Sequence, residues 1–340
     1  MANLTTRYMG LELKNPVIVG ASNLVTDIEN LKRIEKAGAA AIVYKSLFEE
    51  QIQLENLELH ERLTEYEERH AEMITLFPGS GSGPDYPADY LYKLRKAKEA
   101  VSIPLFASLN AMNNETWVEY ATKIQETGVD GIELNFYTVP EKFDRDFNDT
   151  EGLQIKTLQQ VRSAISIPIA VKLSPFYTNP LKFIKDLDKA GANALVLFNR
   201  LFQPDIDVET EQHHFPYNLS NAEDKRLPMR FAGLLHGNID ASVCASSGIF
   251  NGYDVIKMIL AGAGCVQIVS TLYINQIEVI GSILGEIERW MDSRRYENID
   301  GFRGKLSYRN TKNKLPYRRA QYIDYLMTTM EIMTRYKTII

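Results

Sequence analysis

The sequence has no excess of basic residues, and this excludes one large class of functions. Its 38 lysine and arginine residues are outnumbered by 44 acidic residues, which gives a formal net charge of −6 at pH 7 and a pI of about 5.6. A nucleic-acid binder needs a basic surface to displace the counterions of the phosphate backbone. The composition therefore argues against nucleic acid as a partner.

Cysteine and long apolar runs are also scarce. The two cysteines, Cys244 and Cys265, lie in apolar segments, which predicts buried, reduced thiols in a cytosolic protein. No run of about 18 consecutive apolar residues occurs, so no membrane span is expected. The first residues, MANLTTRYMGLELKNPV, hold no apolar run behind a basic stretch and predict no signal peptide. We therefore expect a soluble, cytoplasmic protein.

The sequence also lacks the histidine spacing of a metal site. His213 and His214 are adjacent rather than four residues apart, and His60 and His70 lie in a charged stretch with helical character. The polar positions that follow the predicted strands are not histidine, cysteine or carboxylate residues, which are the usual ligands of zinc. No metal site is expected.

What the sequence does contain is a repeat. The segments KAGAAAIVYK (36–45), ETGVDGIELN (126–135), KAGANALVLFN (189–199) and LAGAGCVQIVS (260–270) follow one pattern. A helix ends at a glycine, which adopts the left-handed conformation that a helix stop requires. A short apolar run follows, and a polar residue stands seven or eight positions after the glycine. Each segment therefore predicts a helix followed by a strand.

Four further apolar runs complete a set of eight predicted strands. They occur in NPVIVGASN, SIPLFASLN, SIPIAVKLS and DASVCASSG. Continuous apolar runs of this length are typical of parallel strands that are buried on both faces. The predicted strands span roughly 16–22, 40–46, 104–109, 131–136, 168–173, 194–199, 241–246 and 265–270.

The segments between these strands have helical periodicity. Residues 27–37 place Ile28, Leu31 and Ile34 on one face, and residues 179–190 repeat the same spacing. Eight alternating strand–helix units predict an α/β fold of the (β/α)8 TIM barrel type. A doubly wound open sheet is the alternative, and the lack of a glycine-rich dinucleotide turn disfavours it.

Two long insertions and a tail interrupt the repeat. Residues 48–92 follow the second strand and residues 201–230 follow the sixth, at the strand ends where barrels build their sites. Both are therefore predicted to cover the active site. Residues 1–293 are expected to form one barrel domain, and the basic, aromatic tail 294–340 a helical extension.

In this fold the reactive groups collect at the carboxyl ends of the strands. Two of those ends carry lysines, Lys45 and Lys172. A lysine in a dry barrel mouth requires an anionic or electron-rich partner, because an unpaired buried charge is costly. The other strand-end residues are Ala21, Ser22, Ser46, Ser108, Asn110, Asn135, Tyr137, Thr138, Asn199, Ser246, Ser247, Gly248, Ser270 and Thr271.

The last two strand ends indicate a phosphate. Each ends in small residues, Ser247-Gly248 and Ser270-Thr271, at the start of a predicted helix. Such residues leave backbone N–H groups free for a phosphate, and barrels often bind phosphate after strands seven and eight. Helix capping by serine is the other explanation. A phosphate beside two lysines predicts flavin mononucleotide (FMN), and a Schiff-base lysine of an aldolase is the alternative.

At these positions the chain resembles the dihydroorotate dehydrogenase family, flavin-containing barrels related to the class 1 enzymes. The matching pieces NPVIVGAS, VYKS, GIELN, VKLSP, VLFN, ASSGI, GYDVIKMILAGA and QIVSTLY occur in order over most of residues 1–293. The resemblance implies FMN and a homodimer. It places Ala21, Ser22, Lys45, Ser46, Asn135, Lys172, Ser247, Gly248, Ser270 and Thr271 at the cofactor. The sequence has no cysteine cluster for an iron–sulfur centre of its own, so fumarate, a quinone or a separate electron-acceptor protein all stay open as the electron acceptor.

The resemblance also implies a reaction, the oxidation of dihydroorotate to orotate in pyrimidine biosynthesis. A base takes a proton while a hydride passes to flavin N5. Lys172 is expected near the flavin N1/O2 edge and Lys45 between flavin and substrate, with Asn135 and Asn199 at the polar edge of the substrate. Thr138 aligns with the base, and its neighbour Tyr137 is the alternative.

Three departures from the family pattern concern the substrate. Pro140 stands where a substrate-binding asparagine is usual, Arg200 follows Asn199 in place of a small hydroxyl residue, and the loop at 77–87 has no matching asparagine. Each lost hydrogen bond to a buried polar group costs about 1–3 kcal/mol. An FMN enzyme that acts on another CH–CH substrate is therefore the second interpretation.

Overall fold

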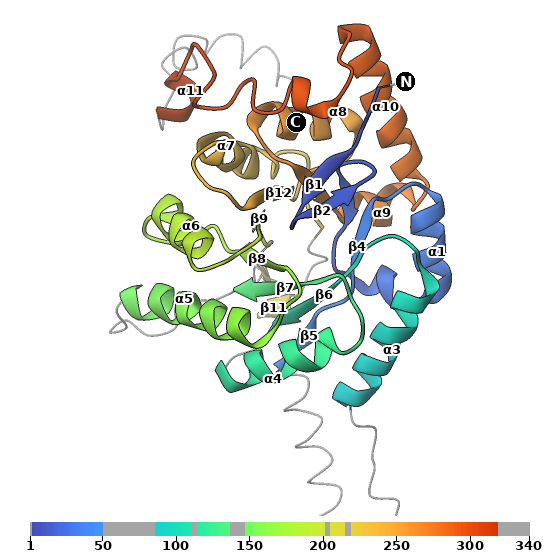
Figure 1. The fold of residues 1–340 in the computed structure, drawn as a ribbon, viewed down its shortest axis with the longest axis vertical. Coiled ribbons are helices and arrows are strands. Elements are labelled where there is room, and N and C mark those ends of the chain that lie inside the picture. The colour runs from blue at the N-terminus through green and yellow to red at the C-terminus, as the bar shows by residue number, and fades with distance from the viewer. Residues whose placement is uncertain are drawn as a thin grey trace, which may run out of the picture.

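Eight parallel strands form a closed barrel in the computed structural model, which describes residues 2–49, 86–110, 114–136, 147–200, 205–214 and 219–318 (Figure 1). They pair in the order β4-β3-β13-β12-β9-β8-β7-β6, and the pairing of β4 with β6 closes the ring. The predicted TIM barrel is confirmed. Its strands are β3 (Val17–Val19), β4 (Ala41–Val43), β6 (Leu105–Asn110), β7 (Gly131–Phe136), β8 (Ile169–Leu173), β9 (Ala194–Leu197), β12 (Ser242–Ser246) and β13 (Cys265–Ile268).

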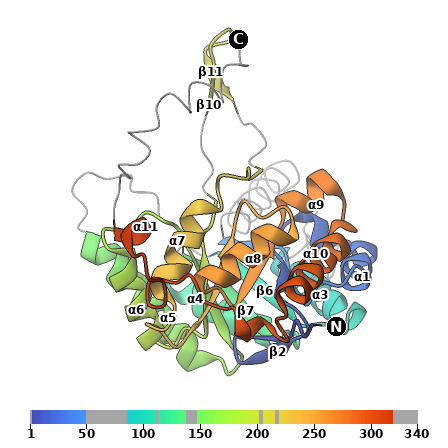
Figure 2. The ribbon, with the colours of Figure 1, turned by 90° about the horizontal axis from the view of Figure 1, so that it is seen from above.

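Helices surround the barrel and cover the outer face of its strands (Figures 1 and 2). Outward-pointing residues such as Ile132 and Leu134 are fully buried beneath them, as expected for strands covered on both faces. The longer helices are α1 (Ile28–Lys36), α3 (Tyr86–Ala100), α4 (Asn114–Gln125), α5 (Phe147–Ala164), α6 (Pro180–Lys189), α7 (Arg226–Leu235), α8 (Gly252–Ala261) and α10 (Val279–Arg294). Shorter ones are η1 (Asn23–Thr26), α9 (Ser270–Asn275), η2 (Ile299–Gly301) and α11 (Leu315–Arg318).

The repeated glycines end helices as predicted. Gly38, Gly128, Gly191 and Gly262 follow α1, α4, α6 and α8, and all four have positive φ angles, between 84° and 135°. A residue with a Cβ atom is strained in this conformation. The four glycines therefore set the point at which each of these helices turns toward the next strand.

A short N-terminal hairpin that the sequence pattern did not reveal closes the amino end of the barrel. Strands β1 (Thr6–Tyr8) and β2 (Leu11–Leu13) pair antiparallel. Tyr8 and Met9 pack with Phe106 and other barrel-interior residues, and the rings of Tyr8 and Phe106 meet edge to face at 5.7 Å. The amino end of the barrel is therefore filled, and any open cavity must lie at the carboxyl ends of the strands.

The two cysteines lie inside this packed layer. Cys244 and Cys265 are fully buried, unbridged and opposite one another on β12 and β13. Burial raises the pKa of Cys265 to about 12 and that of Cys244 well above its usual value. Both thiols are therefore protonated at neutral pH, as the sequence predicted for buried, reduced residues.

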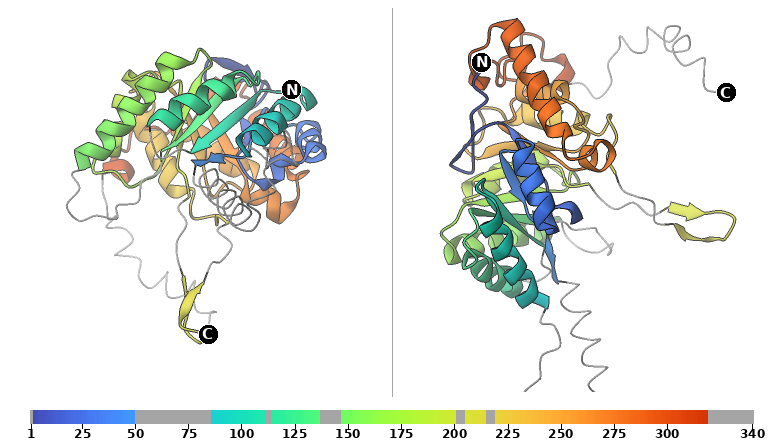
Figure 3. Two further views of the ribbon diagram at one scale, coloured as in Figure 1. Left: turned by 90° about the horizontal axis from the view of Figure 1, so that it is seen from below. Right: turned by 90° about the vertical axis from the view of Figure 1, so that its right-hand side faces the viewer.

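The described parts of the two insertions include strands that were not predicted. After β4, β5 (Leu47–Phe48) pairs with the end of β6. After β9, β10 (Asp205–Asp207) and β11 (Gln212–His214) form an exposed hairpin that stands apart from the barrel (Figures 2 and 3). Of the described residues of the second insertion, 219–230 return to the barrel mouth. The expected covering role of 48–92 and 201–230 stays a prediction, since residues 50–85, 201–204 and 215–218 lie outside the described part.

The tail packs along the barrel where it is described. Phe302 is fully buried, and the backbone N–H groups of Gly304, Leu306 and Tyr308 donate to carbonyl groups of α8 and α7. Residues 295–318 contain only η2 and α11 between turns, and residues 319–340 of the predicted helical extension lie outside the described part. The division into a domain 1–293 and an extension stays a prediction.

Candidate active site

One cavity of about 150 Å³ lies at the carboxyl ends of the strands. The parallel strands all end on the same rim, which brings residues far apart in the sequence together. Of the residues predicted from the sequence, this cavity is lined by Ala21, Lys172, Asn199, Ser246, Ser247, Gly248 and Ser270. We refer to it as the lysine cavity, after Lys172.

The backbone at one side of the lysine cavity is strained. Ser247 has a φ angle of 80° and Gly248 one of 70°. A positive φ at a residue other than glycine costs on the order of 1–3 kcal/mol and is concentrated at functional sites. A Cβ atom on Gly248 would lie 2.3 Å from the backbone nitrogen of Lys225, so only glycine fits at this position.

Ser270, which lines the same cavity, is bound by a residue of the second insertion. The backbone N–H and the hydroxyl group of Ser220 both donate to Ser270 Oγ, each at 2.9 Å. Ser220 also lines the lysine cavity. The neighbouring Thr271 is fully buried and donates to the carbonyl oxygen of Phe250 at 3.3 Å, so its hydroxyl supports the loop after β12.

Lys172 extends from β8 into a buried polar cluster. Its Nζ donates to Oε1 of Gln267 at 3.2 Å and lies 3.6 Å from Oε1 of Glu133. Gln267 Nε2 in turn donates to Oε2 of Glu133 at 2.5 Å. The three residues come from β8, β13 and β7, and Glu133 and Gln267 are only 1% and 2% exposed.

A second polar cluster joins the ends of β4, β6 and β7. Asn135 Nδ2 donates to Ser108 Oγ at 2.7 Å, and the hydroxyl groups of Ser108 and Ser46 are 2.7 Å apart. The Tyr90 hydroxyl donates to the carbonyl oxygen of Lys45 at 2.8 Å. Asn135 and Ser108 are therefore held in place by neighbours on the rim. The Lys45 side chain has no ion-pair partner among residues 2–49, 86–110 and the other described ranges.

The structure describes Ser22 but not the predicted base. Ser22 follows Ala21 after β3, and its buried Oγ has no hydrogen-bond partner within the described part of the chain. Thr138, the predicted base, lies outside the described residues, as do Tyr137, Pro140 and positions 77–85 of the substrate loop. Their roles stay predictions.

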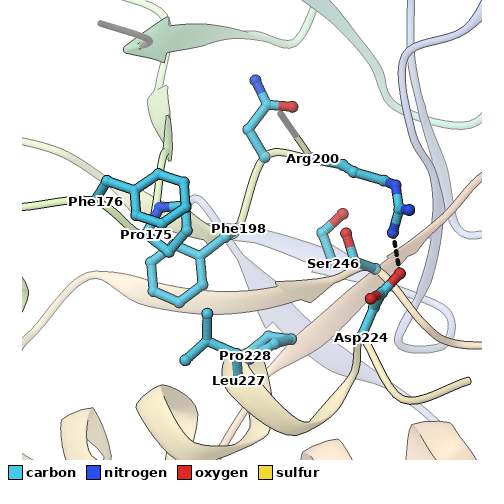
Figure 4. Close-up of a pocket in the computed structure, with 10 residues that line it drawn as sticks. Pro175, Phe176, Phe198, Arg200, Asp224, Leu227, Pro228 and Ser246 are labelled. Atoms are coloured by element: carbon cyan, nitrogen blue, oxygen red, sulfur yellow. Dashed lines mark hydrogen bonds and ion pairs between the residues drawn. The ribbon is translucent and has the colours of Figure 1, made fainter. Parts of the chain in front are cut away.

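A larger cavity, of about 230 Å³, adjoins the lysine cavity through Asn199, Arg200, Ser246 and Ser247 (Figure 4). Apolar side chains form one wall, and Arg200 forms an ion pair with Asp224 at the other (Figure 4). Arg200 lines both cavities, so this departure from the family pattern lies between them. The apolar wall consists of Pro175, Phe176, Phe198, Leu227 and Pro228.

Three residues of the site were missed from the sequence. Glu133 and Gln267 stand in the middle of apolar strands, and Glu133 has the same side-chain direction as Asn135, two positions later. A charged residue inside such a strand could have indicated a polar layer within the barrel. Ser220 carried no signal, because its contact with Ser270 spans 50 residues.

Within the described ranges, no group of three or more histidine, cysteine, aspartate or glutamate residues could hold a metal ion. No helix in the same ranges is long and apolar enough to cross a membrane.

A comparison with models of protein families matches residues 3–291 to the family described as dihydroorotate dehydrogenase. The chain belongs to the dihydroorotate dehydrogenase family. It is therefore an oxidoreductase that acts on a CH–CH bond. This assignment overrides the aldolase alternative, in which Lys172 or Lys45 would form a Schiff base.

Several relatives agree with this membership. The chain is 27% identical over 311 residues to the catalytic subunit of dihydroorotate dehydrogenase B (NAD(+)) from Thermoplasma volcanium, covering 88% of this chain and 97% of the relative. It is 28% identical over 322 residues to the protein of that name from Methanocella arvoryzae, covering 91% and 99%. It is 22% identical over 355 residues to chloroplastic dihydropyrimidine dehydrogenase (NADP(+)) from Arabidopsis thaliana, covering 95% and 81%.

Proposed function

We propose that this protein is an FMN-dependent dihydroorotate dehydrogenase that oxidises dihydroorotate to orotate. The observation that carries the proposal is the lysine cavity, in which Lys172 faces the same space as the Ser247-Gly248 turn and Ser270. One end of this arrangement suits a phosphate and the other an electron-accepting ring. The membership of the dihydroorotate dehydrogenase family supports this choice of cofactor and substrate.

The residues present fit FMN. Ser22 offers a buried hydroxyl without a protein partner, Gly248 lets the backbone approach closely, and Ser270 and Ser220 supply hydroxyl groups beside it. Lys172 would supply a cation to offset the negative charge that the ring gains on reduction. FMN, when bound, supplies the hydride acceptor. We expect Ala21, Lys45, Ser46, Asn135, Ser247 and Thr271 to complete its surroundings.

The protein's share of the reaction is to position the substrate and to move one proton. Asn135 and Asn199 would bind the polar edge of the substrate ring, and Lys45 would balance charge at the ring face. The proton removed from the substrate would pass to Thr138 Oγ. A hydroxyl group is a weak base, so Thr138 needs a hydrogen-bond acceptor that takes up its own proton.

The function is tested by mixing the purified, FMN-loaded protein with dihydroorotate in the absence of oxygen. We expect the yellow flavin absorbance to bleach as the flavin is reduced, with the release of orotate. A protein that binds FMN but is not bleached by dihydroorotate would contradict the assigned substrate. A protein that is colourless and does not bind added FMN would contradict the cofactor as well.

A neutral reduced pyrimidine, such as dihydrouracil, is the second candidate substrate. Two observations favour it: the relative named dihydropyrimidine dehydrogenase aligns with 95% of this chain, and Pro140 replaces a substrate-binding asparagine. The same anaerobic experiment, run in parallel with dihydrouracil, separates the two. Bleaching by dihydrouracil alone would assign the enzyme to neutral rings.

Thr138→Ala is expected to slow the reduction of FMN by the substrate about 10²- to 10⁴-fold, because general base catalysis contributes roughly this much. The rate is measured by stopped-flow absorbance under anaerobic conditions. Tyr137→Phe is the matched control, since it removes the neighbouring hydroxyl group. If Tyr137→Phe is the slow variant and Thr138→Ala reacts normally, the base is Tyr137.

We also propose that the electrons leave through a separate acceptor protein, and that the enzyme is a cytoplasmic homodimer. The chain has two cysteines, both buried, and no cysteine cluster for an iron–sulfur centre of its own. The names of its relatives from Thermoplasma volcanium and Methanocella arvoryzae describe catalytic subunits. Co-purification with a partner that restores electron transfer to NAD+ would support this assignment, and efficient turnover with fumarate alone would contradict it.

A further inference from the structure

Glu133 is a buried carboxylate that the proposed reaction leaves without a role. It lies in the middle of β7, between apolar neighbours, with 1% of its surface exposed. Its Oε1 has no hydrogen-bond partner within the described part of the chain and lies 3.6 Å from the Lys172 ammonium group. Burying a carboxylate is costly unless a cation and hydrogen bonds compensate it. Lys172 is therefore the charge partner of Glu133.

Gln267 connects the two charged groups in one orientation. Its Nε2 donates to Glu133 and its Oε1 accepts from Lys172. Reversing the amide would turn its N–H group toward the ammonium and its oxygen toward the carboxylate, and both contacts would be repulsive. The amide is therefore fixed by its partners, and it in turn fixes the direction from which Lys172 reaches the cavity.

Two other titratable groups near Glu133, Tyr8 and Cys244, stay neutral. Burial raises the pKa of each well above its usual value. Glu133 contributes to both shifts. Neither group is charged at neutral pH. The electrostatic effect of this cluster on a bound ring therefore depends on how far the negative charge of Glu133 offsets the positive charge of Lys172.

We propose that Glu133 is a positioning residue that, together with Gln267, holds the Lys172 ammonium at the cofactor and lowers the reduction potential of the bound flavin. This inference rests on the proposed function, because it needs FMN in the lysine cavity. Reduction adds negative charge to the ring, and a nearby cation favours that change. A carboxylate 3.6 Å from the cation opposes it.

The test is the midpoint potential of bound FMN in Glu133→Gln, measured by anaerobic titration with a reference dye. Glutamine keeps the shape of the side chain and removes its charge. We expect the reduced form to be favoured about tenfold relative to the unaltered protein, which corresponds to a rise of about 30 mV for a two-electron couple. The ratio of the FMN dissociation constants of the oxidised and reduced forms must change by the same factor.

Asp130→Asn is the matched control, because Asp130 precedes the amino end of the same strand and pairs with Lys98, at the other end of the barrel. It removes an equal charge, and we expect the midpoint potential to stay unchanged. Lys172→Met is expected to lower the potential. The double variant Glu133→Gln/Lys172→Met removes both charges and is expected to return it toward the original value.

Each outcome supports or overturns one statement. An unchanged potential in Glu133→Gln, or an equal shift in Asp130→Asn, overturns the role of Glu133 and leaves the proposed function intact. Failure of the unaltered protein to bind FMN overturns the proposed function itself. If Glu133→Gln does not fold, Glu133→Asp is the second variant, because it keeps the charge but moves it one methylene farther from Lys172. A smaller rise in the midpoint potential is expected. No rise in the potential of Glu133→Asp overturns the inference.

Discussion

Replacing Lys172 with Ala is expected to slow the reduction of bound FMN by dihydroorotate about 10²- to 10³-fold. The ammonium group lines the lysine cavity, where its charge would stabilise the negative charge that the ring gains. Removing one preorganised electrostatic group from a dry site costs a factor of this size. The rate is measured anaerobically in a stopped-flow instrument, with FMN affinity determined separately so that weak binding is not mistaken for slow reduction.

The same substitution also affects folding, and a second variant separates the two effects. Lys172→Ala leaves the Glu133 carboxylate buried without its cation, which costs about 3–5 kcal/mol of stability. Adding Glu133→Gln removes that charge, so the double variant is expected to recover most of the stability, while the reduction rate recovers only in part because no cation remains beside the ring. If Lys172→Ala reduces flavin at the original rate once it is folded and loaded with FMN, Lys172 acts only through folding.

Gly248→Ala is expected to abolish FMN binding and to lower the melting temperature. A Cβ atom there would lie 2.3 Å from the backbone nitrogen of Lys225 and 2.9 Å from the carbonyl oxygen of Asn221. These are backbone atoms, so the segment 221–225 must move away from the cavity. The φ angle of 70° adds strain on the order of 1–3 kcal/mol. Thermal unfolding and FMN titration measure the two effects.

Gly128→Ala provides the control for backbone strain alone. Gly128 has a similar φ angle, 84°, but a Cβ atom there would meet no other atom within 4 Å. We expect a loss of about 1 kcal/mol in stability and normal FMN binding. Equal behaviour of the two variants would show that the approach of residues 221–225 to Gly248 has no part in the site.

The strand–helix order of the barrel could be predicted because it depends on local features. Each strand is a continuous apolar run, and helix-ending glycines such as Gly38 and Gly262 mark the start of a repeat unit. These features are independent of distant parts of the chain. The β1–β2 hairpin was missed because its strands are three residues long and alternate only briefly.

The candidate site could be predicted only in part. A barrel places strand ends on one rim, so Lys172, Asn199, Gly248 and Ser270 could be grouped from their positions at strand ends. The clusters of hydrogen bonds could not be foreseen, because they depend on which side chains meet across the barrel. Arg200 illustrates the difference. Its position after a strand end could be predicted from the sequence, whereas its ion pair with Asp224 could not.

The sequence by itself determined the order of the elements and the closed sheet, since periodicity and glycine positions act within a few residues. The tertiary structure alone decided that Lys172 meets Glu133 and Gln267 from two other strands, and that Ser220 binds Ser270. Lys172 is 39 positions from Glu133 and 95 positions from Gln267 in the sequence. Ser220 is 50 positions from Ser270. Closure of the barrel brings these residues together, and no local sequence pattern encodes contacts between residues so far apart in the chain.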